Sequence, residues 1–238
     1  MTEHSGRDTE LTVAARFNGP PDSANGGYLS GLLAQHVDAP AVRVRLHQPP
    51  PLRTPMPVRR APGGGVRLLL GEDTVAEAVP APVPARRIEP VPPAEAERAS
   101  AGYRGRHGHP FPTCFVCGPA RRAGDGLRLF AGPLDDEART DTVACAWTPG
   151  PDPAGVPLAW AALDCPGGWS VDITGRPMLL GQLTAAVFAV PRPGELHVVL
   201  GRLLGVEGRK VHTASALYDA AGAELARAEA VWIRLRQP

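Results

Sequence analysis

The sequence predicts an α+β protein in which a large antiparallel sheet wraps around one helix in each of two similar halves. Each half contains one run that is apolar nearly all round, as expected of a helix buried by a sheet. Several strand-like runs with short connections follow each helix, and only antiparallel pairing allows such short links. Six prolines over residues 80–93 separate the halves, in a segment that suits neither a helix interior nor a central strand.

The bulk composition narrows the class of protein. Of 238 residues, 43% are hydrophobic, which favours a packed core despite 28 prolines and 27 glycines. The 25 basic residues nearly balance the 24 acidic ones, so there is no electrostatic case for a nucleic acid or an anionic membrane as partner. The polar N-terminus lacks a signal-peptide core, and no apolar run is long enough to span a membrane. We therefore expect a cytoplasmic protein.

The first half reads as a strand, a helix and then a run of strands. A strand-like run over residues 11–17 precedes Asn25-Gly26-Gly27-Tyr28, which is expected to open the helix because Asn is a good N-cap. Alternating runs then predict four strands, at residues 42–46, 57–60, 66–70 and 74–79.

The second half repeats this order after the proline-rich segment, which we interpret as an extended linker. An apolar run predicts a helix over residues 157–165, ended by Pro166-Gly167-Gly168. A turn at residues 218–222 fits a hairpin. Strands are predicted around these features at residues 127–130, 142–147, 178–190, 197–204, 210–218 and 224–235.

Two motifs carry a resemblance to a known family. Cys114-Phe115-Val116-Cys117-Gly118, followed by Gly126 to Phe130 and by Leu163-Asp164, resembles the start of hotdog thioesterases of the phenylacetate-pathway type. Asn25-Gly26-Gly27-Tyr28 with Val44 to Pro51 resembles the N-terminal half of double-hotdog acyl-CoA thioesterases. The resemblance implies two tandem hotdogs on one chain, which imitate a hotdog dimer.

The resemblance also implies domain bounds and a function. It places the first hotdog at residues 1–79, the linker at 80–109 and the second hotdog at 110–238. It implies hydrolysis of an acyl thioester of coenzyme A or of an acyl carrier, with coenzyme A as part of the substrate and no other cofactor. The acyl chain and a homo-oligomeric state are left open.

Hotdog thioesterases of this type use a composite site, and the resemblance implies which residues would form it. Backbone N–H groups at the start of one hotdog's helix polarise the thioester carbonyl, and a carboxylate nine residues along the other helix acts as base or nucleophile. The first half has the Asn25-Gly26-Gly27-Tyr28 start, but Ala34 stands nine residues after Asn25. The second half has Asp164, but its start is Gly155-Val156-Pro157, where Pro157 has no N–H. One composite site therefore keeps both parts, with Asp164 as the catalytic residue, and the other site keeps neither.

Each of these residues also has an ordinary structural interpretation. Asp164 could cap the Pro-Gly-Gly turn at the expected helix end. Asn25 with its two glycines could be a plain helix start, and Tyr28 could belong to the core as easily as to an acyl pocket.

Cysteines and arginines around residue 114 suggest further sites. Cys114 and Cys117 form half a zinc knuckle, but a zinc site needs four ligands and there is no second CxxC. The remaining candidate ligands are Cys145, Cys165, His107 and His109, and we expect no metal. Neighbouring arginines could hold the phosphates of coenzyme A or form a solvated loop; they are Arg104, Arg106, Arg121 and Arg122.

Some positions depart from the family. Medium-chain double-hotdog thioesterases position water with a Thr and a Gln, and the register here places Leu204 and Val231 near those positions, with Glu229 close by. The alternative to a hydrolase is therefore a non-catalytic acyl-CoA- or lipid-binding module on a degenerate double hotdog. A dehydratase that pairs His36 with the acid ranks third.

Overall fold

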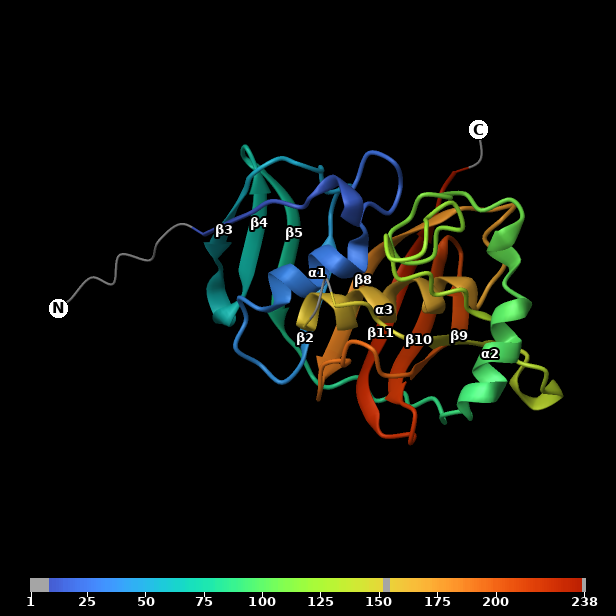
Figure 1. Ribbon diagram of the computed structural model, residues 1–238. Helices are drawn as coiled ribbons and strands as arrows, with labels where there is room; N and C mark the ends of the chain where they lie inside the picture. The colour runs from blue at the N-terminus through green and yellow to red at the C-terminus, as the bar shows by residue number, and fades with distance from the viewer. Residues whose placement is uncertain (1–8, 152–154, 237–238) are drawn as a thin grey trace.

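The described part of the first half contains one α-helix and five strands. In the computed structural model, which describes residues 9–151 and 155–236, helix α1 covers Gly26–Ala34 (Figure 1). Four of the sheet strands, those after the helix, agree with the predicted runs to within one residue at each end. The five strands are β1 (Thr9–Leu11), β2 (Val42–Leu46), β3 (Met56–Arg60), β4 (Val66–Leu70) and β5 (Asp73–Pro80).

In the second half, the described residues form two α-helices and six strands. The helices are α2 (Pro93–Ala101) and α3 (Val156–Trp169). Four long strands follow α3 in consecutive order, as predicted, and the hairpin at 218–222 closes with the Asp219 N–H donating to the Ala223 carbonyl at 3.0 Å. The strands are β6 (Gly132–Pro133), β7 (Thr142–Trp147), β8 (Met178–Val187), β9 (His197–Glu207), β10 (Lys210–Asp219) and β11 (Glu224–Arg234).

All these strands belong to a single sheet. Its order is β1-β3-β4-β5-β2-β8-β11-β10-β9-β7-β6, and every pairing is antiparallel. The halves join where β2 pairs with β8, from Val42 opposite Ala185 to Arg45 opposite Gln182. Figure 1 shows α1 and α3 side by side in front of this sheet. Among the described residues, no helix combines the length and apolar character needed to cross a membrane.

Two glycines allow α1 to lie directly on α3. A Cβ at Gly27 would lie 2.5 Å from the Cβ of Asp164, and a Cβ at Gly31 would lie 2.6 Å from the Cα of Pro157. Gly31 comes after Gly27 in α1, whereas its partner Pro157 comes before Asp164 in α3, so the two helices run antiparallel. Their contact brings the start of α1 against the middle of α3.

The predicted end of the second helix is wrong. The helix continues through Pro166 to Trp169, so Asp164 lies in its interior and does not face the negative end of a helix dipole. Close packing explains the continuation: a Cβ at Gly167 would lie 2.7 Å from the Thr213 Oγ1, and one at Gly168 would lie 3.1 Å from the Trp232 ring. The buried contact outweighs the hydrogen bond that Pro166 removes.

The predicted strand over residues 11–17 is also mostly wrong. Only Leu11 lies in a strand, and Ala15–Phe17 form a 3₁₀ turn. Tertiary contacts fix this turn, since the Phe17 ring stacks on Tyr28 at 4.0 Å and the Phe17 carbonyl accepts the Asn25 N–H at 2.8 Å.

Residues 127–130, predicted as a strand, form no strand of the sheet. The N–H groups of Leu127 and Leu129 instead donate to the carbonyls of Phe115 and Val116, both at 2.9 Å. Arg128 has a φ of 55°, which breaks an extended conformation. The segment therefore pairs locally with the cysteine-containing loop.

The proline-rich stretch forms neither helix nor strand over residues 81–92, and α2 then starts with Pro93 at its first turn. Ile88, Val91 and Ala96 are buried in a second apolar cluster together with Leu200 and Tyr218 of the sheet. The stretch is thus packed against the second half along much of its length.

Candidate active site

The residues predicted to form one composite site meet in the structure. The Asp164 Oδ2 on α3 accepts a hydrogen bond from the backbone N–H of Gly27 at 3.0 Å and another from the Asn25 Nδ2 at 2.7 Å. The donors come from the first half and the acceptor from the second. The contact therefore spans 137 to 139 residues of sequence.

Asn25 is held in place by its role at the start of α1. Its own N–H donates to the Phe17 carbonyl at 2.8 Å, and its Oδ1 accepts the N–H of Tyr28 at 2.9 Å, as an N-cap does. With Oδ1 engaged in the cap, Nδ2 is free to donate to Asp164. The ordinary capping interpretation and the site interpretation of Asn25 are thus both realised.

Asp164 is a buried carboxyl with one oxygen left over. The residue is 2% exposed, and its Oδ1 has no hydrogen-bond partner in the part of the chain that the structure describes. Burial raises its pKa to about 7, with a contribution from Cys114, while the hydrogen bonds from Gly27 and Asn25 oppose the rise. A carboxyl of this kind is suited to accept a proton near neutral pH.

A small cavity and a surface groove meet at the start of α1. The cavity has a volume of about 60 Å³, is lined by Asn25, Gly26 and Asp164 among apolar side chains, and has room for water. The groove, of about 170 Å³, runs past Leu46 and is mainly apolar. Gly26, Leu179 and Leu180 line both, so a chain lying in the groove would reach the Asp164 carboxylate past Gly26.

The backbone donors at this helix start are not all free. The N–H groups of Gly27 and Tyr28 already donate to Asp164 and Asn25. The N–H of Gly26 has no acceptor among the described residues, and it is the donor left for a ligand oxygen. The Tyr28 ring stacks on Phe17 and meets Phe115 edge-on, so it lies in the core and does not line the cavity.

The equivalent position at the other end of the α1–α3 pair lies between the end of α1 and the start of α3, and its described residues include no acid. A pocket there is lined by Ala34 of α1 and by Val156 and Trp160 of α3, and none of its lining residues among those described is titratable. Pro157 supplies no N–H at that helix start. The described residues thus form one site that has an acid and one that has none.

Several other candidates have structural roles. Glu229 lies away from the cavity, and its Oε1 accepts the backbone N–H groups of Ala85 and Arg86 at 3.1 and 3.0 Å. The Arg121 guanidinium donates to the carbonyls of Arg16 and Thr113, and these hydrogen bonds hold it away from a role in phosphate binding. Neither Glu229 nor Arg121 belongs to the cavity of Asp164.

His36 and Arg106 are two further candidates from the sequence. His36 follows α1 and does not line the cavity, which removes the geometric basis for a His36–Asp164 dehydratase pair. Arg106 donates to the Ser100 carbonyl and lies 5.0 Å from the centre of the Phe130 ring. The charge of Arg104 acts on Asp172, whose pKa it helps to lower.

Sequence reasoning did not place four other residues of this cavity. His109, Cys114, Cys117 and Cys165 line it together with Asp164. The CxxC was visible in the sequence, and Cys165 directly follows Asp164. The contact between residues 114 and 165 depends on the packing of a loop on α3, for which no local pattern exists.

Comparisons with known proteins agree on the fold. No family model matches the sequence, and no curated protein matches it significantly. A hot dog fold protein of unknown function from Alicyclobacillus acidocaldarius matches with a TM-score of 0.64 at 13% identity, over 98% of this chain and 95% of that one. An acyl-CoA thioesterase II from Mycobacterium marinum matches with a TM-score of 0.61 at 12% identity, over 96% and 93%.

A third match extends the same finding. A tesB protein from Mycobacterium avium subsp. paratuberculosis matches with a TM-score of 0.63 at 9% identity, over 95% of this chain and 92% of that one. Identities this low bear on the fold alone. They confirm that the chain has the α+β double-hotdog fold over nearly its full length.

Proposed function

On a double-hotdog fold with a single acid-bearing site, we propose that this chain hydrolyses acyl thioesters of coenzyme A or of an acyl carrier. One observation carries the proposal: Asp164 is fixed through Oδ2 by Gly27 and Asn25 of the other hotdog, while its buried Oδ1 is unpaired. An anchored carboxylate with a free oxygen beside a water-sized cavity is what a general base requires. The similarity of fold to acyl-CoA thioesterases supports the same reaction class.

The geometry suggests how the reaction would proceed. The Asp164 Oδ1 takes a proton from a water molecule in the cavity, and the resulting hydroxide attacks the thioester carbonyl. The carbonyl oxygen becomes negative and accepts the Gly26 N–H at the positive end of α1. The tetrahedral intermediate collapses, the carbon–sulfur bond breaks, and the thiolate leaves with the proton from Asp164. Acid and thiol are the products.

Direct attack by Asp164 is the alternative route to the same products. Oδ1 would then form an acyl anhydride that water hydrolyses. A single turnover in ¹⁸O-water tests the anhydride route, because label enters the Asp164 side chain only when water attacks the Asp164 carbonyl of an anhydride.

Asp164→Asn is expected to abolish the release of free thiol from a panel of acyl-CoA substrates of different chain length. The amide cannot accept the proton, but it keeps the shape and removes a buried charge, so the melting temperature should not fall. Asp38→Asn is the matched control, because Asp38 is exposed in the loop after α1. Thiol release is measured with a thiol-reactive dye and unfolding by differential scanning fluorimetry.

The outcomes separate the two candidate functions. Unchanged turnover in Asp164→Asn would contradict the proposed mechanism. Saturable binding of acyl-CoA by the wild-type chain, without turnover at any chain length, would instead favour the non-catalytic binding module.

A further inference from the structure

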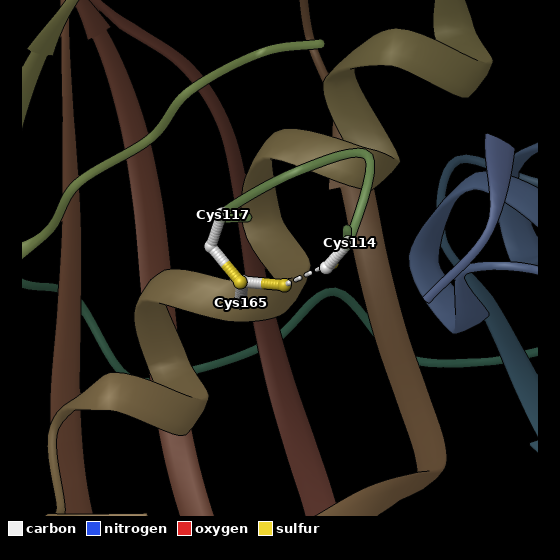
Figure 2. A group of neighbouring side chains, drawn as sticks. All are labelled: Cys114, Cys117 and Cys165. Carbon is white, nitrogen blue, oxygen red and sulfur yellow. Dashed lines mark hydrogen bonds between the residues drawn. The ribbon is translucent and has the colours of Figure 1, made fainter. Parts of the chain in front are cut away.

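Three cysteines from two distant parts of the sequence meet beside the Asp164 cavity. Cys114 and Cys117 lie on one loop, and Cys165 lies on α3 one residue after Asp164 (Figure 2). All three side chains are buried, and their sulfur atoms all lie within 4.8 Å of one another. Helix α3 therefore adds a third sulfur, that of Cys165, to the CxxC pair.

The spacing of one pair of these sulfurs is that of two ligands around one ion. Zinc–sulfur bonds of about 2.3 Å in a tetrahedral site place two sulfurs about 3.8 Å apart. The Cys114 and Cys165 sulfurs are 3.8 Å apart, as the dashed line in Figure 2 marks. A disulfide needs about 2.05 Å, so these sulfurs lie at ligand spacing and are not bonded.

The donor set indicates which ion would fit. All three ligand atoms are cysteine sulfurs, and they lie buried within 4.8 Å of one another. Three thiolates in this buried place need a cation to balance them, and thiolate ligands favour zinc among the common divalent ions.

His109 supports the cluster from outside it. Its Nδ1 accepts the N–H of Phe111 at 2.8 Å, which leaves the ring proton on Nε2. That Nε2 lies 3.3 Å from the Cys117 sulfur and so donates to it. A side chain that hydrogen-bonds to a metal ligand orients that ligand and tunes the affinity for the metal. His109 is placed to do this for Cys117.

We propose that Cys114, Cys117 and Cys165 bind one divalent zinc ion, with a water from the adjoining cavity as the fourth ligand. Three thiols lose three protons to solvent as the three zinc–sulfur bonds form, and no electron is transferred. Three protein ligands and one solvent ligand make an open site. The ion fastens the cysteine loop to α3 at the residue after Asp164, and it thereby helps to hold that carboxylate against α1.

The test uses the full chain, purified in reductant without chelator, stripped of metal and then reloaded with zinc. Zinc is counted per chain by mass spectrometry of the elements, and cobalt replaces it to report thiolate ligation by charge-transfer absorption. We expect one ion per wild-type chain, and no tightly held ion in Cys114→Ser or Cys165→Ser. Cys145→Ser is the matched control, since Cys145 is also a buried free cysteine but lies outside the cluster.

His109→Gln should keep the stoichiometry and lower the zinc affinity about tenfold to a hundredfold, as expected for a hydrogen-bonding partner of a ligand. A wild-type chain that retains no more zinc than Cys165→Ser would overturn the proposal, as would a cobalt form without thiolate charge transfer. The wild-type measurements need no variant to fold, and none of the readouts depends on thioester turnover.

Discussion

Asn25 is the residue on which both parts of the candidate site depend. Its Oδ1 caps α1 through the Tyr28 N–H, and its Nδ2 holds the Asp164 Oδ2 from the other hotdog. A primary amide carries its acceptor and its donor on two separate atoms, so it can cap the helix and hold the carboxylate at the same time. An ionised Asp is an equally good N-cap but has no donor, and a Ser has a single hydroxyl oxygen for both contacts.

This dual role predicts the effect of Asn25→Asp. The variant keeps the capping oxygen, but it replaces a donor with a second carboxylate 2.7 Å from where Asp164 accepts. We expect the free energy of unfolding to fall by about 2 kcal/mol, since a hydrogen bond to a charged group is lost and like charges meet. Urea denaturation measures it, with Asn25→Ser as the uncharged variant that keeps the cap. Equal stability of Asn25→Asp and the wild-type chain would contradict the pairing.

At the scale of elements, the site depends on how closely α1 approaches α3. Gly27 and Gly31, one turn apart, leave no space for a Cβ against Asp164 and Pro157. The close approach is what lets a backbone N–H of one helix reach a side chain of the other.

Gly31→Ala is expected to separate the helices slightly and to cost about 1–3 kcal/mol of stability, as overpacking of a core does. Ser30→Ala is the neighbouring control, because Ser30 is buried with an unpaired Oγ, so its removal should cost little. Thermal unfolding followed by circular dichroism compares the two. A Gly31→Ala melting curve that overlays that of Ser30→Ala would show that the contact is not tight.

The elements also show how far the sequence predicts this structure. Strands such as 42–46, 66–70 and 142–147 are found as predicted, because alternation of apolar residues is a local property. The end of α3 was mispredicted because the Pro-Gly-Gly rule is local, whereas Gly167 and Gly168 are placed by their contact with β10 and β11. The strand expected at residues 127–130 failed for a similar reason, since its partners lie in a loop.

The candidate site was predictable only in part. The resemblance to hotdog thioesterases, with its nine-residue spacing, implied Asn25, Gly27 and Asp164, which the structure brings together. The hydrogen bond from the Gly27 N–H to Asp164 cannot be predicted from sequence, because it depends on how far α1 is shifted along α3. Cys165 could not be joined to Cys114 and Cys117 for the same reason.

At the scale of the whole molecule, the two hotdogs are alike in fold but unequal in chemistry. They share one sheet through β2 and β8, and the helices pack with their starts at opposite ends of the pair. One end brings Asp164 to Gly26 and Gly27, and the other brings only Ala34 to Val156. Under the proposed function, a pseudo-dimer of this kind should therefore bind a thioester at one end only.

The most direct measurement is a crystal structure of the wild-type chain with an acyl-CoA analogue in which a methylene replaces the thioester sulfur. We predict one molecule per chain, with its acyl chain in the groove along Leu46 and Leu180. Its carbonyl oxygen should accept the Gly26 N–H, and its carbonyl carbon should lie one water molecule away from the Asp164 Oδ1. A carbonyl group bound beside Ala34 and Val156, or bound out of reach of Asp164, would contradict the composite site.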